Sequence, residues 1–549
     1  MIIYLYLIGL YFFCIIRSSV CDICSTCSCP ILINEGPIIN CHGKHLGNND
    51  MLNFDLLTLD EYQALNKLVL SKNDIVNLPK NLLKKLKLLK SIDLSENVME
   101  KMYTTMFKDL SNLEDLNLSK NVLRNFDDSL LEALPSLLSL NLSYNRIDSI
   151  EHRMNTATTK ITTLDLSHNN ITNISKQFTE SLPMVNYLDL SFNRIHSLAD
   201  CELVQLNSLK VIYINNNFLT TLNTQMLPQS LFQLYAGYNQ IAEVLYSFPH
   251  IEVLSIEYNK ISKIHTNVAT DNLQRLNVSG NMLSNFPDML LENLKILDMS
   301  YNNLTYIPKA ISIKNFPLLT QLNISGNPIQ NLTLHSDIKL NLFVANNMSK
   351  LEAINKDTLV NLRSPSTDCI NLTISNNKML SFIHEDAVKH LSLCSLDLSN
   401  NQFAYVAQKL TVCNTNSTTC SVNLQGNPFH CNCSLQWMLN DLIPKLYSVQ
   451  PNLLDNLRCA WPSQISHMRM VHWYGWEGDI FCTDISNFSE NLTMNLAGVE
   501  TERVVKIDST FGALAIIGAT MTMLIILIII GIIWNQRVHM KRRRMNRKF

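Results

Sequence analysis

The chain has 549 residues and nearly balanced charge, with 44 Lys and Arg against 46 Asp and Glu and a formal net charge of -2. No basic stripe recurs along it, which argues against nucleic acid as a partner. Glycine, at 14 residues, is too sparse for loop-rich active sites of the usual kind.

The chain begins with an apolar run that carries no charge, from Ile2 to Ile16, and the small residues Ser19 and Cys21 follow it. This order is typical of a secretory signal peptide. We therefore expect residues 1–21 to be a signal peptide. Since no basic residue precedes the apolar run, an uncleaved membrane anchor is the alternative.

The next segment, residues 22–64, is rich in cysteine. Its cysteines after the predicted cleavage site are Cys24, Cys27, Cys29 and Cys41. In a secreted chain such spacing indicates disulfides, and a zinc site built on the Cys24 and Cys27 pair is the alternative.

Residues 65–429 repeat one pattern sixteen times: apolar-x-x-apolar-x-apolar-x-x-Asn-x-apolar. The clearest copy runs from Leu113 to Leu123. The asparagines recur at intervals of 24 up to Asn217, and the intervals fall to 22, 20, 22 and 21 between Asn217 and Asn302. The pattern is that of a leucine-rich repeat. The asparagines are Asn73, Asn97, Asn121, Asn145, Asn169, Asn193, Asn217, Asn239, Asn259, Asn281, Asn302, Asn327, Asn347, Asn377, Asn401 and Asn427.

Each repeat should form a short strand whose apolar side chains are buried only when neighbouring repeats stack on it. The expected fold class is therefore α/β: a curved leucine-rich-repeat solenoid with a parallel sheet on its concave face and connectors on its convex face. The asparagine amide, which both donates and accepts, should satisfy backbone groups at the inward turn after each strand.

Residues 430–483 again carry cysteines, namely Cys431, Cys433, Cys459 and Cys482. Beyond a stalk at 484–510, the stretch 511–534 has no charge and is long enough to span a bilayer as a helix. The remaining residues, 535–549, carry seven Lys or Arg and no acid, which predicts a cytoplasmic tail. We therefore expect a single-pass type I protein of the plasma membrane with its N-terminus outside.

The two cysteine clusters that flank the repeats resemble the N- and C-terminal caps of extracellular leucine-rich-repeat proteins. This family includes Slit, the Nogo receptor, small proteoglycans and the ectodomains of Toll-like receptors, and our chain shows no TIR domain. The resemblance implies the disulfides Cys24–Cys29, Cys27–Cys41, Cys431–Cys459 and Cys433–Cys482.

Five cysteines fall inside the repeats. Cys394 and Cys420 occupy equivalent places in adjacent repeats, within reach of a disulfide. The alternative is a local Cys413–Cys420 bridge together with Cys369–Cys394. Cys201 has no obvious partner and is best interpreted as a buried free thiol.

Asn-x-Ser/Thr sequons are frequent, and several arise because the repeat itself favours Asn-Leu-Ser. The predicted glycosylation sites are Asn117, Asn141, Asn170, Asn277, Asn303, Asn323, Asn331, Asn371, Asn416, Asn487 and Asn491.

An aromatic band runs through the middle repeats, at and near the position just before the recurring asparagine. Aromatic residues are enriched in protein interfaces, so we predict that this band binds a ligand on the concave face. The alternative is that this position merely tolerates such side chains. The predicted ligand-binding residues are Tyr187, Phe192, Tyr213, Tyr235, Tyr238 and Tyr258.

Nothing in the sequence favours an enzyme, a cofactor or a metal. Asp93, Asp165 and Asp189 recur because the repeat favours Leu-Asp-Leu-Ser, not because they are catalytic acids. We expect a cell-surface receptor or adhesion protein that binds an extracellular protein or cell-surface partner, with homo- or hetero-oligomers as a possibility. A signalling co-receptor or decoy related to Toll-like receptors, acting through a partner subunit, is the alternative.

Overall fold

The computed structural model describes residues 26–482 apart from eleven short gaps, and the gaps are 33–35, 48–64, 79–82, 85, 152–158, 200–202, 246–249, 266–271, 366–367, 412–420 and 476–477. The predicted signal peptide, stalk, transmembrane helix and tail lie outside the described residues, as do Cys24, Cys201, Cys413, Cys420, Asn416, Asn487 and Asn491. Among the residues that are described, no helix combines the length and the apolar character needed to cross a bilayer.

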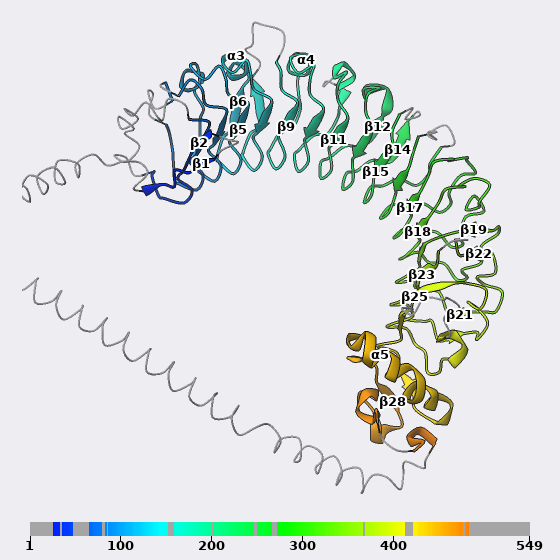
Figure 1. Ribbon diagram of the computed structural model, residues 1–549. Helices are drawn as coiled ribbons and strands as arrows, with labels where there is room; N and C mark the ends of the chain where they lie inside the picture. Colours follow the sequence, from blue (N-terminus) through cyan, green and yellow to red (C-terminus); the bar gives the residue numbers. More distant parts are fainter. Residues whose placement is uncertain are drawn as a thin grey trace, which may run out of the picture.

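The molecule is an arc, and one sheet of 18 strands lines its inner side (Figure 1). The first two strands pair antiparallel, and every later strand pairs in parallel with the one before it. In spatial order the strands are β1 (Ile31–Leu32), β2 (Gly36–Asn40), β3 (Lys67–Val69), β4 (Ser91–Asp93), β5 (Asp115–Asn117), β7 (Ser139–Asn141), β9 (Thr163–Asp165), β10 (Tyr187–Asp189), β11 (Val211–Tyr213), β13 (Gln233–Tyr235), β15 (Val253–Ser255), β16 (Arg275–Asn277), β17 (Ile296–Asp298), β18 (Gln321–Asn323), β20 (Leu342–Val344), β23 (Ile370–Thr373), β25 (Leu393–Asp397) and β26 (Ser421–Asn423).

Each repeat strand is short because only its middle residue faces the core. In β5 the side chain of Leu116 is completely buried, whereas Asp115 and Asn117 on either side are partly exposed on the inner face. Leu116 lies in register with Ile92 and Leu140 of the neighbouring strands. Side chains alternate between the two faces of a strand, so this register builds one continuous apolar column. The predicted parallel solenoid is confirmed.

The outer side of the arc consists of short helices and small two-stranded sheets (Figure 1). Phenylalanines from this side fill the space behind the sheet, and Phe126 and Phe178 meet edge to face with ring centroids 6.3 Å apart. The outer elements are η2 (Thr104–Met106), β6 (Asn125–Asp127), α3 (Ser129–Ala133), β8 (Ser149–Glu151), α4 (Lys176–Glu180), η4 (Leu203–Gln205), β12 (Thr221–Asn223), η5 (Thr224–Met226), β14 (Glu243–Leu245), β19 (Ile338–Lys339), β21 (Ala353–Ile354), β22 (Leu362–Arg363), β24 (Phe382–Ile383) and η7 (Gln408–Thr411).

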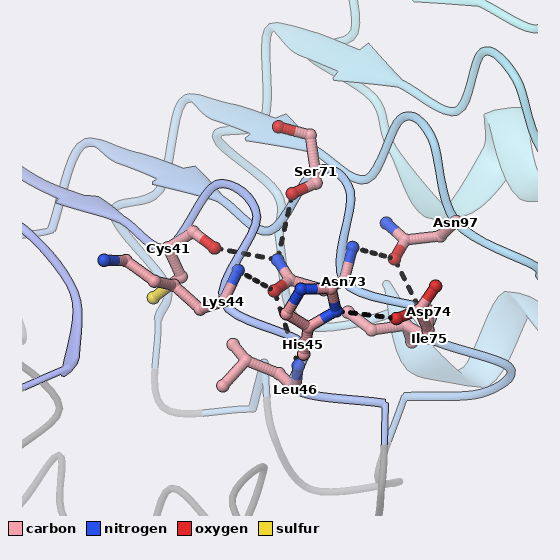
Figure 2. A network of polar contacts seen from close by, with 9 residues as sticks. All are labelled: Cys41, Lys44, His45, Leu46, Ser71, Asn73, Asp74, Ile75 and Asn97. Carbon is pink, nitrogen blue, oxygen red and sulfur yellow. Dashed lines mark hydrogen bonds and ion pairs between the residues drawn. The ribbon is translucent and has the colours of Figure 1, made fainter. Parts of the chain in front are cut away.

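The recurring asparagines form the expected internal ladder, which starts against the N-terminal cap (Figure 2). The Asn73 amide donates to the carbonyl oxygens of Cys41 and Ser71, at 2.8 and 3.0 Å. Its own backbone N–H donates to Oδ1 of Asn97, 3.0 Å away, and so does that of Ile75. Each asparagine thereby satisfies buried backbone groups of its own repeat and of the one before.

The ladder is interrupted at the β20 repeat, and the prediction of Asn347 as its ladder residue was wrong. The ladder residue lies five positions beyond the buried middle of the strand, so Phe343 places Met348 there, and Met348 is fully buried. Asn347 is exposed instead, and its amide donates to the hydroxyl of Tyr301 at 3.1 Å. Asn346 and Asn347 precede Met348. The sequence pattern was therefore matched to Asn347, one residue before the position that enters the core.

Disulfide-bonded caps close both ends. The predicted pairs Cys27–Cys41, Cys431–Cys459 and Cys433–Cys482 are confirmed, with Cα atoms 4.5, 5.6 and 4.1 Å apart. Cys29 is also disulfide-bonded. Because the Cys27 sulfur is bonded to Cys41, the alternative of a zinc site on Cys24 and Cys27 was wrong.

The C-terminal cap covers the end of the core with short helical segments. Its elements are β27 (Phe429–His430), η8 (Cys433–Leu435), η9 (Met438–Leu442), α5 (Ile443–Val449), η10 (Pro451–Leu454), β28 (Cys459–Trp461), η11 (Ser463–Ile465), η12 (Met470–Trp473) and η13 (Ile480–Cys482).

One further disulfide joins two repeats. Cys369 is bonded to Cys394, with Cα atoms 5.1 Å apart. The first prediction for Cys394, a bridge to Cys420, was therefore wrong. Cys369 directly precedes β23 and Cys394 lies within the paired strand β25, which extends one residue pair further than other strands and brings these two cysteines together.

Candidate protein-binding surface

The residue before each ladder position has left-handed backbone geometry. Its φ lies between 50° and 71° in all sixteen repeats, because the chain must turn inward there to bring the ladder residue into the core. Its N–H still donates to the next repeat, for example from Phe192 to the carbonyl of Asn215 at 2.9 Å. The sixteen residues are Lys72, Glu96, Lys120, Tyr144, His168, Phe192, Asn216, Tyr238, Tyr258, Gly280, Tyr301, Gly326, Asn347, Asn376, Asn400 and Gly426.

These sixteen residues, which we call the edge row, do not lie on the strands of the concave face. Phe192 and Tyr238 stand three residues beyond the ends of β10 and β13, so they lie along the carboxyl edge of the sheet. Tyr187, Tyr213 and Tyr235 are strand residues of the inner face itself. The single aromatic band expected from the sequence is therefore two separate surfaces.

The three strand tyrosines form one cluster on the inner face. The rings of Tyr213 and Tyr235 are stacked, with centroids 4.4 Å apart and planes 3° apart, and Tyr187 meets Tyr213 at 5.6 Å. The hydroxyl of Tyr235 donates to Gln233 at 3.2 Å. All three are partly exposed and held by their neighbours, so little rotamer entropy remains to be lost on binding.

The edge row carries two aromatic stacks. Tyr144, His168 and Phe192 stack at 3.8 and 4.0 Å, and Tyr238 stacks on Tyr258 at 4.5 Å. A non-glycine residue with left-handed geometry costs about 1–2 kcal/mol, and each stacked pair, contributing about 0.5–1.5 kcal/mol, offsets part of the cost of its two residues. An open hollow beside the first stack is lined by its rings and by Asn216.

Two aspartates lie beside the strand tyrosines. Asp165 and Asp189 face each other in register on β9 and β10, and Asp189 is in register with Tyr213. Burial and the nearby Asp165 raise the pKa of Asp189, although hydrogen bonds from Ser191 oppose the rise. Burial, followed by the charge of Asp189, raises the pKa of Tyr187 to about 12. The tyrosine cluster is thus flanked by negative charge.

The position of His168 inside the first stack favours its neutral form. Burial between its two stacking partners lowers its pKa below the usual value, and the carboxylates of Asp189 and Asp165 oppose this shift only in part. A neutral imidazole would place no charge between the rings of Tyr144 and Phe192.

The recurrent aspartates have a structural role. Asp93, Asp165 and Asp189 each accept the backbone N–H of the serine two residues later, at 2.9–3.0 Å. Asparagines take this role in other repeats: the side chains of Asn117, Asn141, Asn277 and Asn323 accept the same bond. These four predicted glycosylation sites are strand residues of the inner face, on either side of the tyrosine cluster.

Among the described residues, one cluster of acidic and sulfur-containing side chains is close enough to share a metal ion. It consists of Asp368, Cys369 and Cys394. Both sulfurs are, however, bonded to each other, so neither can act as a thiolate ligand.

Three aromatic residues of these surfaces belong to the band expected from the sequence but were not among the predicted ligand-binding residues. Tyr144, His168 and Tyr301 belong to the edge row, and Tyr144 and Tyr301 are 51% and 48% exposed. Their signal was present in the sequence, because they stand in the same column as Phe192 and Tyr238.

Comparison with known proteins shows what the repeats are. Residues 63–219 match, in overlapping windows, the family model described as leucine rich repeat, and residues 293–312 match a second model of that description. A transforming growth factor beta activator, LRRC33 of Danio rerio, is 27% identical over 293 residues, which cover 44% of this chain and 39% of that protein. Human oligodendrocyte-myelin glycoprotein is 31% identical over 132 residues, covering 23% of this chain and 29% of that protein. The chain thus spans well under half the length of these relatives.

Among solved structures, the leucine-rich-repeat protein LIC12759 of Leptospira interrogans superimposes with a TM-score of 0.51 and 21% identity, over 74% of this chain and 93% of that one. At this identity the likeness concerns the fold alone. The family matches, the ladder and this likeness together show that the chain is built of several leucine-rich repeats and has the leucine-rich-repeat fold.

Proposed function

We propose that this protein is a non-enzymatic cell-surface receptor or adhesion protein that binds a protein ligand on the inner face of its arc. One observation carries the proposal: Tyr187, Tyr213 and Tyr235 form a partly exposed, stacked cluster on strands whose positions the ladder fixes. Rigid aromatic side chains supply large contact areas at small entropic cost, which makes them frequent hot spots of protein interfaces.

The surroundings of the cluster support a protein ligand. Aspartates lie on its N-terminal side, so the surface combines apolar contact area with charge that can select a partner. The predicted glycans at Asn141 and Asn277 would stand on either side of it and leave the middle of the inner face open. No cofactor enters the proposal.

The place of action is the exterior of the cell. Four disulfides among the described residues favour an oxidising compartment. The apolar segment at 511–534 and the basic residues after it would hold the chain in the plasma membrane as a single-pass type I protein. A surface biotinylation experiment on intact cells tests this placement, since labelling of the repeats and protection of residues 535–549 are both required.

Ligand capture tests the function. The full chain, purified in a mild detergent, is screened against an array of cell-surface and secreted proteins, in parallel with the double variant Tyr213→Ala/Tyr235→Ala. Loss of an aromatic hot spot costs about 2 kcal/mol, so a genuine partner should bind the variant at least about thirtyfold more weakly. Tyr103→Ala is the matched control, because Tyr103 is 52% exposed on the outer side. Equal binding to the double variant would eliminate the inner-face site.

A further inference from the structure

One sequon that the sequence pattern assigned to the core is exposed in the structure. Asn347, Met348 and Ser349 form an Asn-x-Ser sequon. Asn347 is not among the glycosylation sites predicted from the sequence, where it was assigned to the buried ladder. In the structure Met348 enters the core and is fully buried, whereas Asn347 and Ser349 on either side of it are both exposed. The two residues that define the sequon therefore lie on the surface.

The backbone at Asn347 presents its side chain to solvent. Its φ is 54°, the left-handed geometry shared by the edge row, which turns the next residue into the core and leaves this one outside. Asn277 and Asn323, two of the predicted sites on the strands of the inner face, are only partly exposed. An N-linked sugar is bulky and needs a surface position. Asn347 meets this need better than those two inner-face sites.

The Asn347 side chain is held beside an aromatic ring. Tyr301, Gly326 and Asn347 are the edge-row residues of three consecutive repeats, which follow β17, β18 and β20. The Tyr301 ring lies over Gly326, where a side-chain carbon would clash with it. Because Gly326 has no side chain, the Tyr301 hydroxyl reaches Asn347, whose Nδ2 donates to it at 3.1 Å. The atom that would carry a sugar thus lies at the hydroxyl end of this ring.

A sugar can be attached at this atom without loss of the contact. The bond that forms joins Nδ2 to the anomeric carbon of N-acetylglucosamine in a lipid-linked oligosaccharide donor. The bond from that carbon to the pyrophosphate of the donor breaks, and one amide proton leaves with the pyrophosphate, so nothing is oxidised or reduced. The amide has two N–H groups, so one remains to donate to Tyr301. Since a C–N single bond is about 1.45 Å long, the anomeric carbon would lie within about 4.6 Å of the Tyr301 hydroxyl oxygen.

We propose that Asn347 is N-glycosylated and that its first sugar covers the Tyr301 ring. Tyr301 is 48% exposed, and a tyrosine offers both an apolar ring and a hydroxyl to a sugar beside it. The aromatic part of the edge row that stays open to a protein then ends at Tyr258, which is the edge-row aromatic before Tyr301. The inference rests on the extracellular placement proposed above and goes beyond it by naming a modification site and the ring that it shields.

Peptide mapping tests the modification. Trypsin cuts after Lys339 and Lys350, and the peptide between them contains no other sequon. The full chain is produced in cultured animal cells, and its peptides are deglycosylated with peptide N-glycosidase in heavy-oxygen water, which converts a glycosylated asparagine to an isotope-labelled aspartate. The label should appear at Asn347 in the wild type. It should be lost in Ser349→Ala, which removes the sequon and keeps the asparagine, and retained in Ser349→Thr, which keeps the sequon.

The tryptic peptide 296–309 is the control for passage through the secretory pathway, because its one sequon is the exposed predicted site Asn303. Label at Asn303 without label at Asn347 would refute the inferred site and leave the extracellular placement standing. Absence of label from both peptides would refute the placement together with the site, because a chain that stays outside this pathway receives no N-linked sugar.

The contact with Tyr301 needs a second measurement. Hydroxyl-radical footprinting should show faster oxidation of Tyr301 in Ser349→Ala than in the wild type, because loss of the sugar uncovers the ring. Tyr144, which is 51% exposed in the first stack of the same row, should be oxidised equally in both. Thr333→Ala is the matched control, since it removes the sequon at Asn331, an exposed residue of the preceding repeat. Unchanged oxidation of Tyr301 in Ser349→Ala, or an equal rise in Thr333→Ala, would overturn the contact.

Discussion

Replacing one ladder asparagine should strongly destabilise the solenoid. Asn193 is 5% exposed, and its amide donates to the carbonyl oxygens of Leu166, Leu190 and Ser191 at 2.9, 3.1 and 3.2 Å. Its Oδ1 accepts the N–H of Ile171 at 3.0 Å. Asn193→Ala removes all four bonds and leaves buried backbone groups without partners. At about 1 kcal/mol for each bond, the loss is about 4 kcal/mol, a large part of the 5–15 kcal/mol typical of a folded domain.

Urea unfolding of the full chain, followed by circular dichroism, measures this loss, and hydrogen exchange at the Ile171 amide locates it. Arg194→Ala is the matched control, because Arg194 is the next residue in the chain and is exposed. The control should change the free energy of unfolding by less than about 0.5 kcal/mol. If Asn193→Ala were no more destabilising than Arg194→Ala, the ladder would not hold the repeats as described.

Three further predictions concern the Cys369–Cys394 disulfide and two titrating groups, His168 and Tyr187. Replacing both Cys369 and Cys394 by Ala should lower the free energy of unfolding by about 3.5 kcal/mol, since the bridge closes a loop of 25 residues; non-reducing peptide mapping checks the pairing itself. His168 has a lowered pKa in the folded chain, so the unfolded chain binds more protons, and the stability gained by a neutral ring is present at pH 7 and lost as the pH falls through the folded pKa. Urea midpoints of the wild type should therefore fall more steeply below pH 6.5 than those of His168→Phe, and parallel curves would contradict the shift. Ultraviolet titration should show an ionisation near pH 12 that is missing in Tyr187→Phe.

The repeat period was enough to predict most of the fold. A buried residue in the middle of each strand and an asparagine five residues later fix the parallel register, and so Leu116 and Asn121 could be placed from the sequence. The cap disulfides were predicted from the resemblance to the cysteine-rich caps of extracellular leucine-rich-repeat proteins, and Cys27–Cys41, Cys431–Cys459 and Cys433–Cys482 are confirmed. The Cys369–Cys394 bridge could not be chosen over its rivals, since it depends on the extra length of β25.

The candidate site could be predicted only in part, because a sequence pattern does not show how deeply a side chain is buried or which backbone conformation its residue adopts. Tyr235 and Tyr238 are three residues apart, yet one lies on a strand and the other on a left-handed turn at the sheet edge. Likewise, Asn347 fits the pattern as well as a ladder residue does. Only the position of Phe343 in its strand shows that Met348 enters the core.

The central claim is that a protein partner covers the inner face at the tyrosine cluster. Hydroxyl-radical footprinting of the full chain, with and without a partner captured in the screen, measures this coverage residue by residue. The account predicts that oxidation of Tyr187, Tyr213 and Tyr235 falls on binding, whereas that of Tyr103 on the outer side does not change. Protection of Tyr103 with undiminished oxidation of the three strand tyrosines would contradict it.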